Sequence, residues 1–322
     1  VMRDLLNVES LTISYRTRDH LVTALLEVSL TLAQGEILGI IGESGCGKST
    51  FSSVIGKLLG PAGVVENGHI TFGGKDVLSF SGQELRSYRA NDIAYVFQDP
   101  MNTLDPTKTI GAQFRRLISA SAWRQKAIEA LAHVGLTDWR RVLPSYPHQL
   151  SGGMAQRAVI AMALIRKPRL LIADEPTAAL DASIRCSVMD LLTAWCAEIG
   201  SAMIIISHDI PVISNYCDRI GVMYAGRFVE IAPAEDFIVG PRHPYAMALL
   251  ASEPGQEGED AVLQSLEGSP PPSISRAPGC AFADRCIYRT APCSAGFPPL
   301  VACGSSKVAC IRLGDIHGEA AS

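Results

Sequence analysis

The feature that most constrains this fold is an apolar run, a glycine-rich loop and a helical stretch that follow one another directly. Residues Glu36-Ile-Leu-Gly-Ile-Ile41 are nearly all apolar, as in a parallel strand buried on both faces. They lead into Gly42-Glu-Ser-Gly-Cys-Gly47-Lys48-Ser49, and 51–59 then has a helical pattern. In this arrangement backbone N–H groups and a helix N-terminus can surround phosphates. The sequence therefore predicts a nucleotide-binding α/β domain.

Each residue of this loop has an expected part in holding a nucleotide. Lys48 is expected to reach the β- and γ-phosphates, and the Ser49 hydroxyl to bind Mg²⁺. The other nucleotide-binding candidates in the loop are Gly42, Glu43, Ser44, Gly45, Cys46, Gly47 and Thr50. A glycine-rich turn with an incidental lysine would give the same letters, but the flanking strand and helix favour a phosphate loop.

A second apolar strand ends in two carboxylates. Residues 170–173 are Leu-Leu-Ile-Ala, and Asp174 and Glu175 follow them. Asp174 is expected to hold Mg²⁺, through water, and Glu175 to polarise the attacking water, because phosphoryl transfer depends on positioning and charge stabilisation. Adjacent acids at a strand end could also be a solvated turn; the phosphate loop elsewhere in the chain favours the catalytic interpretation.

Two further polar residues follow predicted strands. His208 comes after the apolar run 203–206, and Gln98 comes after 93–97. The carboxyl ends of parallel strands share one edge of a sheet, so His208 is expected to contact the γ-phosphate and the attacking water. Gln98 is expected to sense Mg²⁺ and water. Either residue alone is more often structural, and only the order of the motifs supports these roles.

The segment Leu150-Ser-Gly-Gly-Met154 predicts contact with a second subunit. Ser151 could simply be the N-cap of the following helix, with Gly152 and Gly153 merely permitted there. Two glycines at a helix start nevertheless cost about 1 kcal/mol each relative to alanine. They are explained if bare backbone N–H groups approach a phosphate. Because the chain's own nucleotide is held by the loop at 42–49, we expect that phosphate to belong to another subunit.

The rest of the chain has the order of an α/β domain with an insert and a tail. Residues 5–16 alternate like a half-buried strand, 99–148 are mainly helical, and 219–231 have the pattern of a hairpin. Strand–helix alternation elsewhere indicates a parallel sheet. We predict a nucleotide-binding domain over 1–240, with a helical subdomain at about 99–165, and an extension over 241–322.

Composition excludes some classes of protein. Of 322 residues, 48% are hydrophobic and 19% charged, which is typical of a globular chain. The net charge of −4 disfavours a nucleic-acid partner held by bulk electrostatics. No apolar run approaches the ~18 residues that cross a bilayer, and no secretory signal is expected. A raised apolar fraction without a membrane span favours a soluble subunit that docks on another protein.

Five of the nine cysteines lie near the end of the sequence: Cys280, Cys286, Cys293, Cys303 and Cys310. The pattern Cys280-x5-Cys286-x6-Cys293-x16-Cys310 offers four thiolates, which select zinc or iron–sulfur centres. It lacks the tight Cys-x2-Cys pairs of small zinc folds. Arg285 could offset the charge of such a site, and reduced cysteines that pack as small apolar groups are the alternative.

Together these motifs resemble the ATP-binding cassette family. The phosphate loop, Gln98, Leu150–Met154, Asp174-Glu175 and His208 occur in the family's order. The resemblance implies an α/β fold of the P-loop NTPase class: a mixed sheet core, an antiparallel β subdomain and an inserted helical subdomain. It also implies that Tyr15 stacks on the adenine of ATP. Residues Ala179-Leu-Asp181 would form a loop that communicates across a dimer, with Ala179 where the family often has serine.

Four longer segments are similar to the ATPase subunits of dipeptide/oligopeptide importers: Val96–Met101, Tyr146–Met154, Arg242–Tyr245 and Gly279–Cys286. This resemblance implies a heterodimer with a second homologous ATPase, two transmembrane permeases and an extracytoplasmic solute-binding protein. The chain would then lie on the cytoplasmic face of the inner membrane, as a peripheral protein. It also favours a [4Fe-4S] cluster over Zn²⁺ at Cys280, Cys286, Cys293 and Cys310, with Cys303 left free.

Other functions stay open at this stage. A metal chelate or an opine-like compound could be the imported solute in place of a peptide. A cassette ATPase of DNA repair or translation is disfavoured by the short stretch between Ser49 and Ser151, the single cassette and the negative charge. The cysteine tail could also make the chain chiefly a redox or iron sensor.

Overall fold

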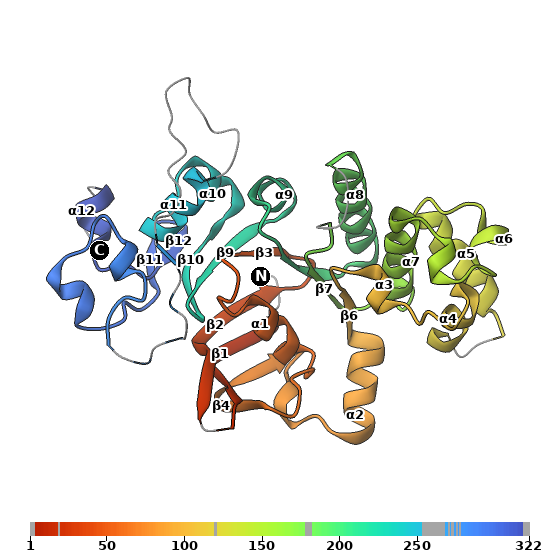
Figure 1. The fold of residues 1–322 in the computed structure, drawn as a ribbon, viewed down its shortest axis with the longest axis horizontal. Helices are drawn as coiled ribbons and strands as arrows, with labels where there is room; N and C mark the ends of the chain where they lie inside the picture. The colour runs from red at the N-terminus through yellow and green to blue at the C-terminus, as the bar shows by residue number, and fades with distance from the viewer. Residues whose placement is uncertain are drawn as a thin grey trace. The chain divides into compact units, whose positions relative to one another are not determined.

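The computed structural model describes residues 4–18, 20–118, 121–177, 182–252, 268–269, 271, 274, 276 and 278–317. The chain divides into two compact units (Figure 1). Unit 1 contains Ala33–Ile37 and Phe80–Ile206, and unit 2 contains Asp4–Leu32, Leu38–Ser79 and the chain from Ser207 onward. Within the described ranges, no helix is long and apolar enough to cross a membrane.

Unit 2 begins with an antiparallel sheet, as predicted. Its strand order is β2-β1-β4-β5, and its strands are β1 (Asp4–Arg16), β2 (Leu21–Ala33), β4 (Gly63–Phe72) and β5 (Lys75–Asp76). Register runs from Leu6 opposite Phe72 to Tyr15 opposite Gly63. A 3-10 turn, η1 (Val77–Ser79), follows. The strand predicted at 5–16 is β1, but its burial does not alternate, because Leu11–Ser14 are all buried and the register shifts between Glu9 and Ile13. Alternate burial, with one covered face, is found in β2 instead.

The strand that carries the phosphate loop lies in a second set of strands of unit 2. β3 (Ile37–Ile41) pairs in parallel with β9 (Arg219–Tyr224), which forms the predicted hairpin with β10 (Arg227–Pro233). Leu38, Ile40 and Ile41 have no exposed surface. Their burial agrees with the continuous apolar run in the sequence. After β3, the loop enters helix α1 (Lys48–Ile55).

The C-terminal extension continues this set of strands. β12 (Ser306–Val308) pairs with β10, with Glu230 opposite Val308, and β11 (Val301–Cys303) pairs with β12. The remaining elements of unit 2 are α9 (Ile210–Tyr216), α10 (Ala234–Val239), α11 (Pro244–Ala251), η4 (Ala283–Arg285), η5 (Ala291–Ser294) and α12 (Leu313–His317). The extension therefore shares backbone pairing with the strands beside the phosphate loop.

Unit 1 combines three parallel strands with the predicted helical insert. The strand order is β8-β7-β6, with β6 (Ile93–Val96), β7 (Leu170–Asp174) and β8 (Ala202–Ile206). The helices before β7 are α2 (Gly82–Ser87), the π-helix η2 (Tyr88–Asp92), α3 (Pro100–Thr103), α4 (Ile110–Leu117), α5 (Trp123–His133), α6 (Trp139–Val142), η3 (Pro147–Gln149) and α7 (Gly152–Leu164). Helix α8 (Ala182–Ile199) joins β7 to β8. The predicted fold class is confirmed.

The predicted boundary at residue 240 separates a nucleotide-binding domain from a C-terminal extension. The two compact units are defined by packing, and unit 2 holds the phosphate loop and the C-terminal extension together. The boundary at 240 and the limits of the helical subdomain at 99–165 therefore stay predictions.

Candidate nucleotide-binding site

The phosphate loop has a backbone that only glycine adopts easily at several positions. Gly42, Gly45 and Gly47 have φ angles of 149°, 79° and 109°. A Cβ atom on Gly42 would lie 2.2 Å from the carbonyl oxygen of Met223, and one on Gly47 would lie 2.8 Å from that of Ala24. Close approach of backbone to backbone thus requires glycine at both positions. The loop shape is set by β9 and β2 as well as by its own sequence.

Lys48 lies folded over the loop. Its Nζ donates hydrogen bonds to the carbonyl oxygens of Gly42, at 2.7 Å, and Glu43, at 3.0 Å. The amine is therefore held above the backbone whose N–H groups are expected to bind phosphate. Cys46 of the same loop is buried, and burial raises the pKa of its thiol. Ser44, Gly45 and Ser49 are exposed, so the part of the loop expected to meet the nucleotide is open.

The structure brings Tyr15 next to the start of α1. The Tyr15 hydroxyl and the Thr50 Oγ1 lie 3.3 Å apart, a hydrogen bond between residues far apart in sequence. Two predicted nucleotide-binding residues are thus neighbours in space. The stacking of Tyr15 on adenine itself stays a prediction.

In unit 1, the two predicted carboxylates lie at the end of β7: Asp174 is its last residue and Glu175 follows it. Asp174 is paired with Ile206 of β8, and the Glu175 N–H donates to the Ile206 carbonyl oxygen at 2.8 Å. Glu175 has a φ angle of 50°, in the left-handed region that a side chain disfavours. Such backbone strain costs about 1–3 kcal/mol and is concentrated at functional sites. The backbone of the candidate catalytic residue is therefore held in a disfavoured conformation by the residues around it.

Gln98 lies at the same sheet edge as these carboxylates. Val96, the last residue of β6, is in register with Ala173 of β7, and both strands run in the same direction. Gln98 is exposed two residues beyond β6. His208, in unit 2, is also exposed and follows the end of β8 by two residues. Their contacts with Mg²⁺, water or phosphate stay predictions.

Ser151 does cap a helix, and the glycines after it are unobstructed. The Ser151 Oγ accepts a hydrogen bond from the Met154 N–H at 3.3 Å, at the start of α7. Among the residues that the structure describes, no atom lies within 4 Å of a Cβ placed on Gly152 or Gly153. The packing of this chain therefore gives no reason for glycine at either position. Ala179–Asp181, predicted to communicate across a dimer, lie outside the described residues.

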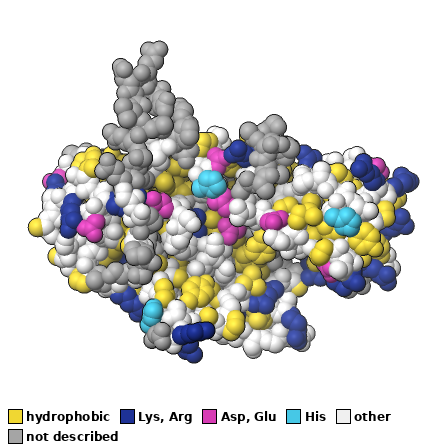
Figure 2. All heavy atoms as spheres, in the orientation of Figure 1, with side chains coloured by type: hydrophobic (Ala, Val, Ile, Leu, Met, Phe, Trp, Pro, Cys, Tyr) yellow, Lys and Arg dark blue, Asp and Glu magenta, His cyan; other side chains and the backbone are white. Residues whose placement is uncertain are grey.

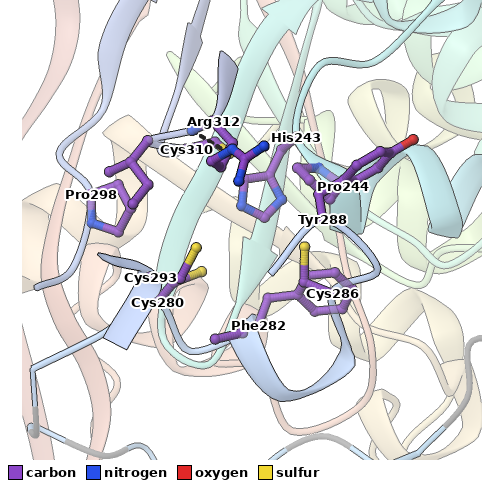
Figure 3. Close-up of a pocket in the computed structure, with 12 residues that line it drawn as sticks. His243, Pro244, Cys280, Phe282, Cys286, Tyr288, Cys293, Pro298, Cys310 and Arg312 are labelled. Atoms are coloured by element: carbon purple, nitrogen blue, oxygen red, sulfur yellow. Dashed lines mark hydrogen bonds between the residues drawn. The ribbon is translucent and has the colours of Figure 1, made fainter. Parts of the chain in front are cut away.

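The four cysteines of the predicted metal site line one pocket. Cys280, Cys286, Cys293 and Cys310 surround it together with His243 and Arg312 (Figure 3). In this view the thiols of Cys280, Cys286 and Cys293 point toward the space below the His243 ring. The fold thus brings four thiols that are separated in sequence to one pocket.

The acidity of these thiols differs. Burial is the main cause of a raised pKa at three of them: Cys280, to about 11, Cys286 and Cys310. Burial also raises the pKa of Cys293, but hydrogen bonds from Thr290 and the charge of Arg312 bring the net value below the usual one. Arg312 also lowers the pKa of Cys286 and Cys310. Arg312 therefore favours the thiolate form at three of the four cysteines, and Arg289 adds to this effect at Cys293.

The structure does not support the prediction of a metal centre. The donor set, four free thiols on one pocket, is the one that iron–sulfur clusters use. Among the residues that the structure describes, however, no group of three or more His, Cys, Asp or Glu side chains is arranged to hold a metal ion. Neither [4Fe-4S] nor Zn²⁺ is confirmed by this geometry. Cys303, expected to be free of the cluster, accepts a hydrogen bond from Arg242 Nη1 at 3.5 Å.

Arg285 has a partner that the sequence did not predict. Its guanidinium forms a two-pronged ion pair with Glu43 of the phosphate loop, with N–O distances of 2.7 and 2.9 Å, and its effect on the thiols stays a prediction. The Tyr245 hydroxyl in turn accepts a hydrogen bond from the Glu43 N–H at 2.9 Å. The sequence does not predict either contact. Arg285 and Tyr245 do lie in two of the segments that resemble importer ATPases, and this resemblance is the one sign in the sequence that the two residues have a function.

Replacement of Gly42 by alanine is expected to weaken nucleotide binding by at least ~10-fold, because the new methyl group overlaps the Met223 carbonyl. Gly74→Ala is the matched control: Gly74 also has a positive φ angle, 81°, but a Cβ there meets nothing within 4 Å. Titration with a fluorescent ATP analogue measures both variants. Equal affinities in the two would show that the Gly42 contact does not shape the loop.

Comparison with known proteins agrees with this geometry. The ABC transporter family matches residues 25–178, and the family described as "Oligopeptide/dipeptide transporter, C-terminal region" matches residues 229–293. The dipeptide transport ATP-binding protein DppD of Bacillus subtilis is 42% identical over 304 residues, which cover 92% of this chain and 91% of that protein. The oligopeptide transport ATP-binding protein OppD of Salmonella typhimurium is 38% identical over 315 residues, with 96% and 93% covered.

Solved structures show the same fold. The dimeric post-hydrolysis structure of the ATP-binding cassette MJ0796, bound to ADP and Pi, has a TM-score of 0.64 and 29% sequence identity, covering 71% of this chain and 98% of that one. The cbiO1 structure from Clostridium perfringens has a TM-score of 0.64 and 30% identity, covering 74% and 91%. With a phosphate loop built on glycines, paired carboxylates after β7 and relatives matched over nearly their whole length, this chain belongs to the ABC transporter family and is an ATP-binding cassette ATPase.

Proposed function

We propose that the chain is the ATP-hydrolysing motor of an importer for di- or oligopeptides. The observation that carries this proposal is the match of 229–293 to the C-terminal region of oligopeptide/dipeptide transporters, in a chain whose residues 25–178 match the ABC transporter family. The relatives named above are dipeptide and oligopeptide transport proteins. A metal chelate or an opine-like compound is the alternative cargo, and transport assays with the assembled importer distinguish them.

In this proposal the chemistry follows the general scheme of phosphoryl transfer. The loop amides and Lys48 would hold the phosphates, Ser49 would ligate Mg²⁺, and Asp174 would hold that ion through water. Glu175 polarises the attacking water, and Gln98 and His208 orient it. The strained backbone of Glu175 supports this assignment, because such strain is concentrated at functional sites.

Two cassettes are proposed to close on ATP. Ser151, Gly152 and Gly153 would present N–H groups to the γ-phosphate held by a second, homologous ATPase subunit. Two observations support this. No described residue packs against the Cα atoms of the two glycines on the side where a Cβ would lie. The structurally similar cassette MJ0796 forms a dimer with ADP and Pi bound. The N-terminus of α7 also favours an anion through the helix dipole.

Docking on two permeases is proposed for the helical region of unit 1. Phe97, Met101 and Tyr146 expose 43%, 40% and 39% of their surface, which suits contact with another protein. Lys and Arg side chains gather at the end formed by α4–α6 (Figure 2), where Arg124 and Arg140 flank Trp139. The chain would then be a peripheral protein on the cytoplasmic face of the inner membrane. An extracytoplasmic solute-binding protein would act through the permeases.

We further propose that Cys280, Cys286, Cys293 and Cys310 ligate a [4Fe-4S] cluster, with Zn²⁺ as the alternative. Their shared pocket and the nearby Arg312 support this, because thiolates need a compensating charge. Bound iron would add rigidity to the extension; no step of ATP hydrolysis is assigned to it.

The Cys293→Ser variant is expected to lose the metal, since one ligand is removed. Iron, acid-labile sulfide and zinc are measured in protein purified without oxygen, with Cys303→Ser as the control that keeps all four ligands. Iron with sulfide in the wild type and in Cys303→Ser, but not in Cys293→Ser, supports the cluster. Zinc alone supports the alternative, and metal-free wild-type protein excludes both.

The Glu175→Gln variant is expected to bind ATP with nearly unchanged affinity and to hydrolyse it at least ~100-fold more slowly, because the amide cannot polarise water. Glu198→Gln, an exposed carboxylate of α8 in the same unit, is the control. Phosphate release and ATP affinity are measured side by side. Hydrolysis at the wild-type rate would remove Glu175 from the reaction.

The Gly153→Asp variant distinguishes an effect on the stability of the chain from an effect on the contact between two cassettes. The side chain enters open space at a helix N-terminus, where an anion is favourable, so the melting temperature is expected to stay unchanged or rise. Facing a partner's γ-phosphate, the same charge should reduce ATPase activity of the assembled importer at least ~10-fold. Gly200→Asp adds the same charge at another exposed position of unit 1. Full activity of Gly153→Asp would contradict the dimer site.

A further inference from the structure

Two separate segments of the C-terminal part contact one residue of the phosphate loop. Arg285, in η4, pairs with the Glu43 carboxylate, and Tyr245, in α11, accepts a hydrogen bond from the Glu43 N–H. Glu43 is the second residue of the loop. One residue of the ATP site is therefore held at both its side chain and its backbone by chain that lies about 200 residues further on.

The ion pair is well shielded from water. The Arg285 side chain exposes only 7% of its surface and that of Glu43 24%. Nη1 donates to one carboxylate oxygen and Nη2 to the other, an arrangement that is strong and directional. Removal of one partner of such a pair leaves the other with an uncompensated charge, which costs more than the pair itself is worth. This geometry distinguishes the contact from an ordinary surface ion pair.

Aromatic packing fixes both partners of Glu43. Tyr245 has no exposed surface, and its ring lies 4.6 Å from that of Tyr224 and 5.3 Å from that of Phe282. The Arg285 guanidinium lies 5.8 Å from the Tyr224 and Phe282 rings, and its Nη1 reaches the Tyr224 hydroxyl at 3.3 Å. Phe282 also lines the cysteine pocket. The pocket and the phosphate loop thus share one aromatic cluster.

The backbone that leads to Tyr245 is fixed as well. The buried Glu230 carboxylate accepts hydrogen bonds from the N–H groups of Arg242 and His243, at 2.7 to 3.0 Å. Burial lowers the pKa of His243 to about 3, so the ring is neutral, and its Nδ1 accepts from the Tyr245 N–H at 3.1 Å. The segment Arg242–Tyr245 is therefore a rigid support from β10 to the phosphate loop.

A carboxylate on a loop that binds a triphosphate needs compensation. Without a cation beside it, Glu43 would repel the anionic ligand and favour other loop conformations. We propose that Arg285 is a positioning residue of the ATP site: through Glu43, the C-terminal extension neutralises and holds the phosphate loop, so that ATP affinity depends on the extension. This inference rests on the proposed function in so far as the loop at 42–50 binds ATP.

The test measures ATP affinity of the full chain with a fluorescent ATP analogue. Arg285→Ala is expected to bind about 5- to 10-fold more weakly, because the Glu43 charge is left uncompensated. Arg289→Ala is the matched control: Arg289 lies in the same segment and pairs with Asp284, but both side chains are at least half exposed. Its affinity should stay within about twofold of the wild type.

A second change separates the charge from a merely structural effect. Glu43→Gln removes the carboxylate charge, so the double variant Arg285→Ala/Glu43→Gln should regain most of the lost affinity. The loss in Arg285→Ala should also shrink as salt is raised, because salt screens the repulsion. If Arg285 only stabilised the fold, the double variant would bind as weakly as the single one at every salt concentration. That result would overturn the proposal.

The other outcomes are equally decisive. Should Arg285→Ala not fold, Arg285→Lys keeps the charge and loses the two-pronged geometry, and an intermediate affinity supports the proposal. Wild-type affinity in Arg285→Ala, in protein that still binds ATP, refutes this inference and leaves the ATPase function intact. Absence of ATP binding in the wild type would instead refute the assignment of the loop.

Discussion

The close contact between the phosphate loop and its neighbouring strands is the constraint on which the rest of the site depends. At Gly42 the backbone comes so near to the Met223 carbonyl that no side chain fits. This contact turns β3 sharply before α1 and lets Lys48 fold back over the loop carbonyls. Loop amides, lysine and helix N-terminus then converge on one region. An anion site follows from backbone geometry before any side-chain chemistry is added.

Much of this arrangement could be predicted from the sequence, because it is local. The apolar run at 36–41 and the loop after it are neighbours in the chain. The spacing of apolar residues along the sequence is enough to distinguish the strands from the helices α4, α5 and α7. The contacts of Glu43 could not be predicted in this way. No local pattern connects a residue of the loop with Tyr245 or Arg285, because their meeting depends on how α11 and η4 pack. For the same reason Arg285, next to Cys286, was expected to serve the thiols.

Short elements mark a second limit of prediction. β12 has only three residues, too few to show a period, yet its pairing with β10 attaches the extension to the strands of unit 2. The π-helix η2 is likewise set by its tertiary surroundings and has no signature in the sequence. Few of the described residues of the extension are buried apolar side chains. Its buried residues, such as Phe282 and Val308, pack against the cassette, which explains how a segment so poor in core can be ordered.

Glu175 and Gly153 are two positions where the residue type is not the one that local stability favours. Glu175 has a side chain where the backbone favours glycine, and Gly153 is a glycine where the backbone has room for a side chain. Neither choice improves the stability of the chain by itself. The first is explained if a carboxylate is needed at the end of β7, and the second if something from outside must reach the N-terminus of α7. Both features agree with the proposal that ATP bound by one cassette is contacted by the N-terminus of α7 of a second cassette.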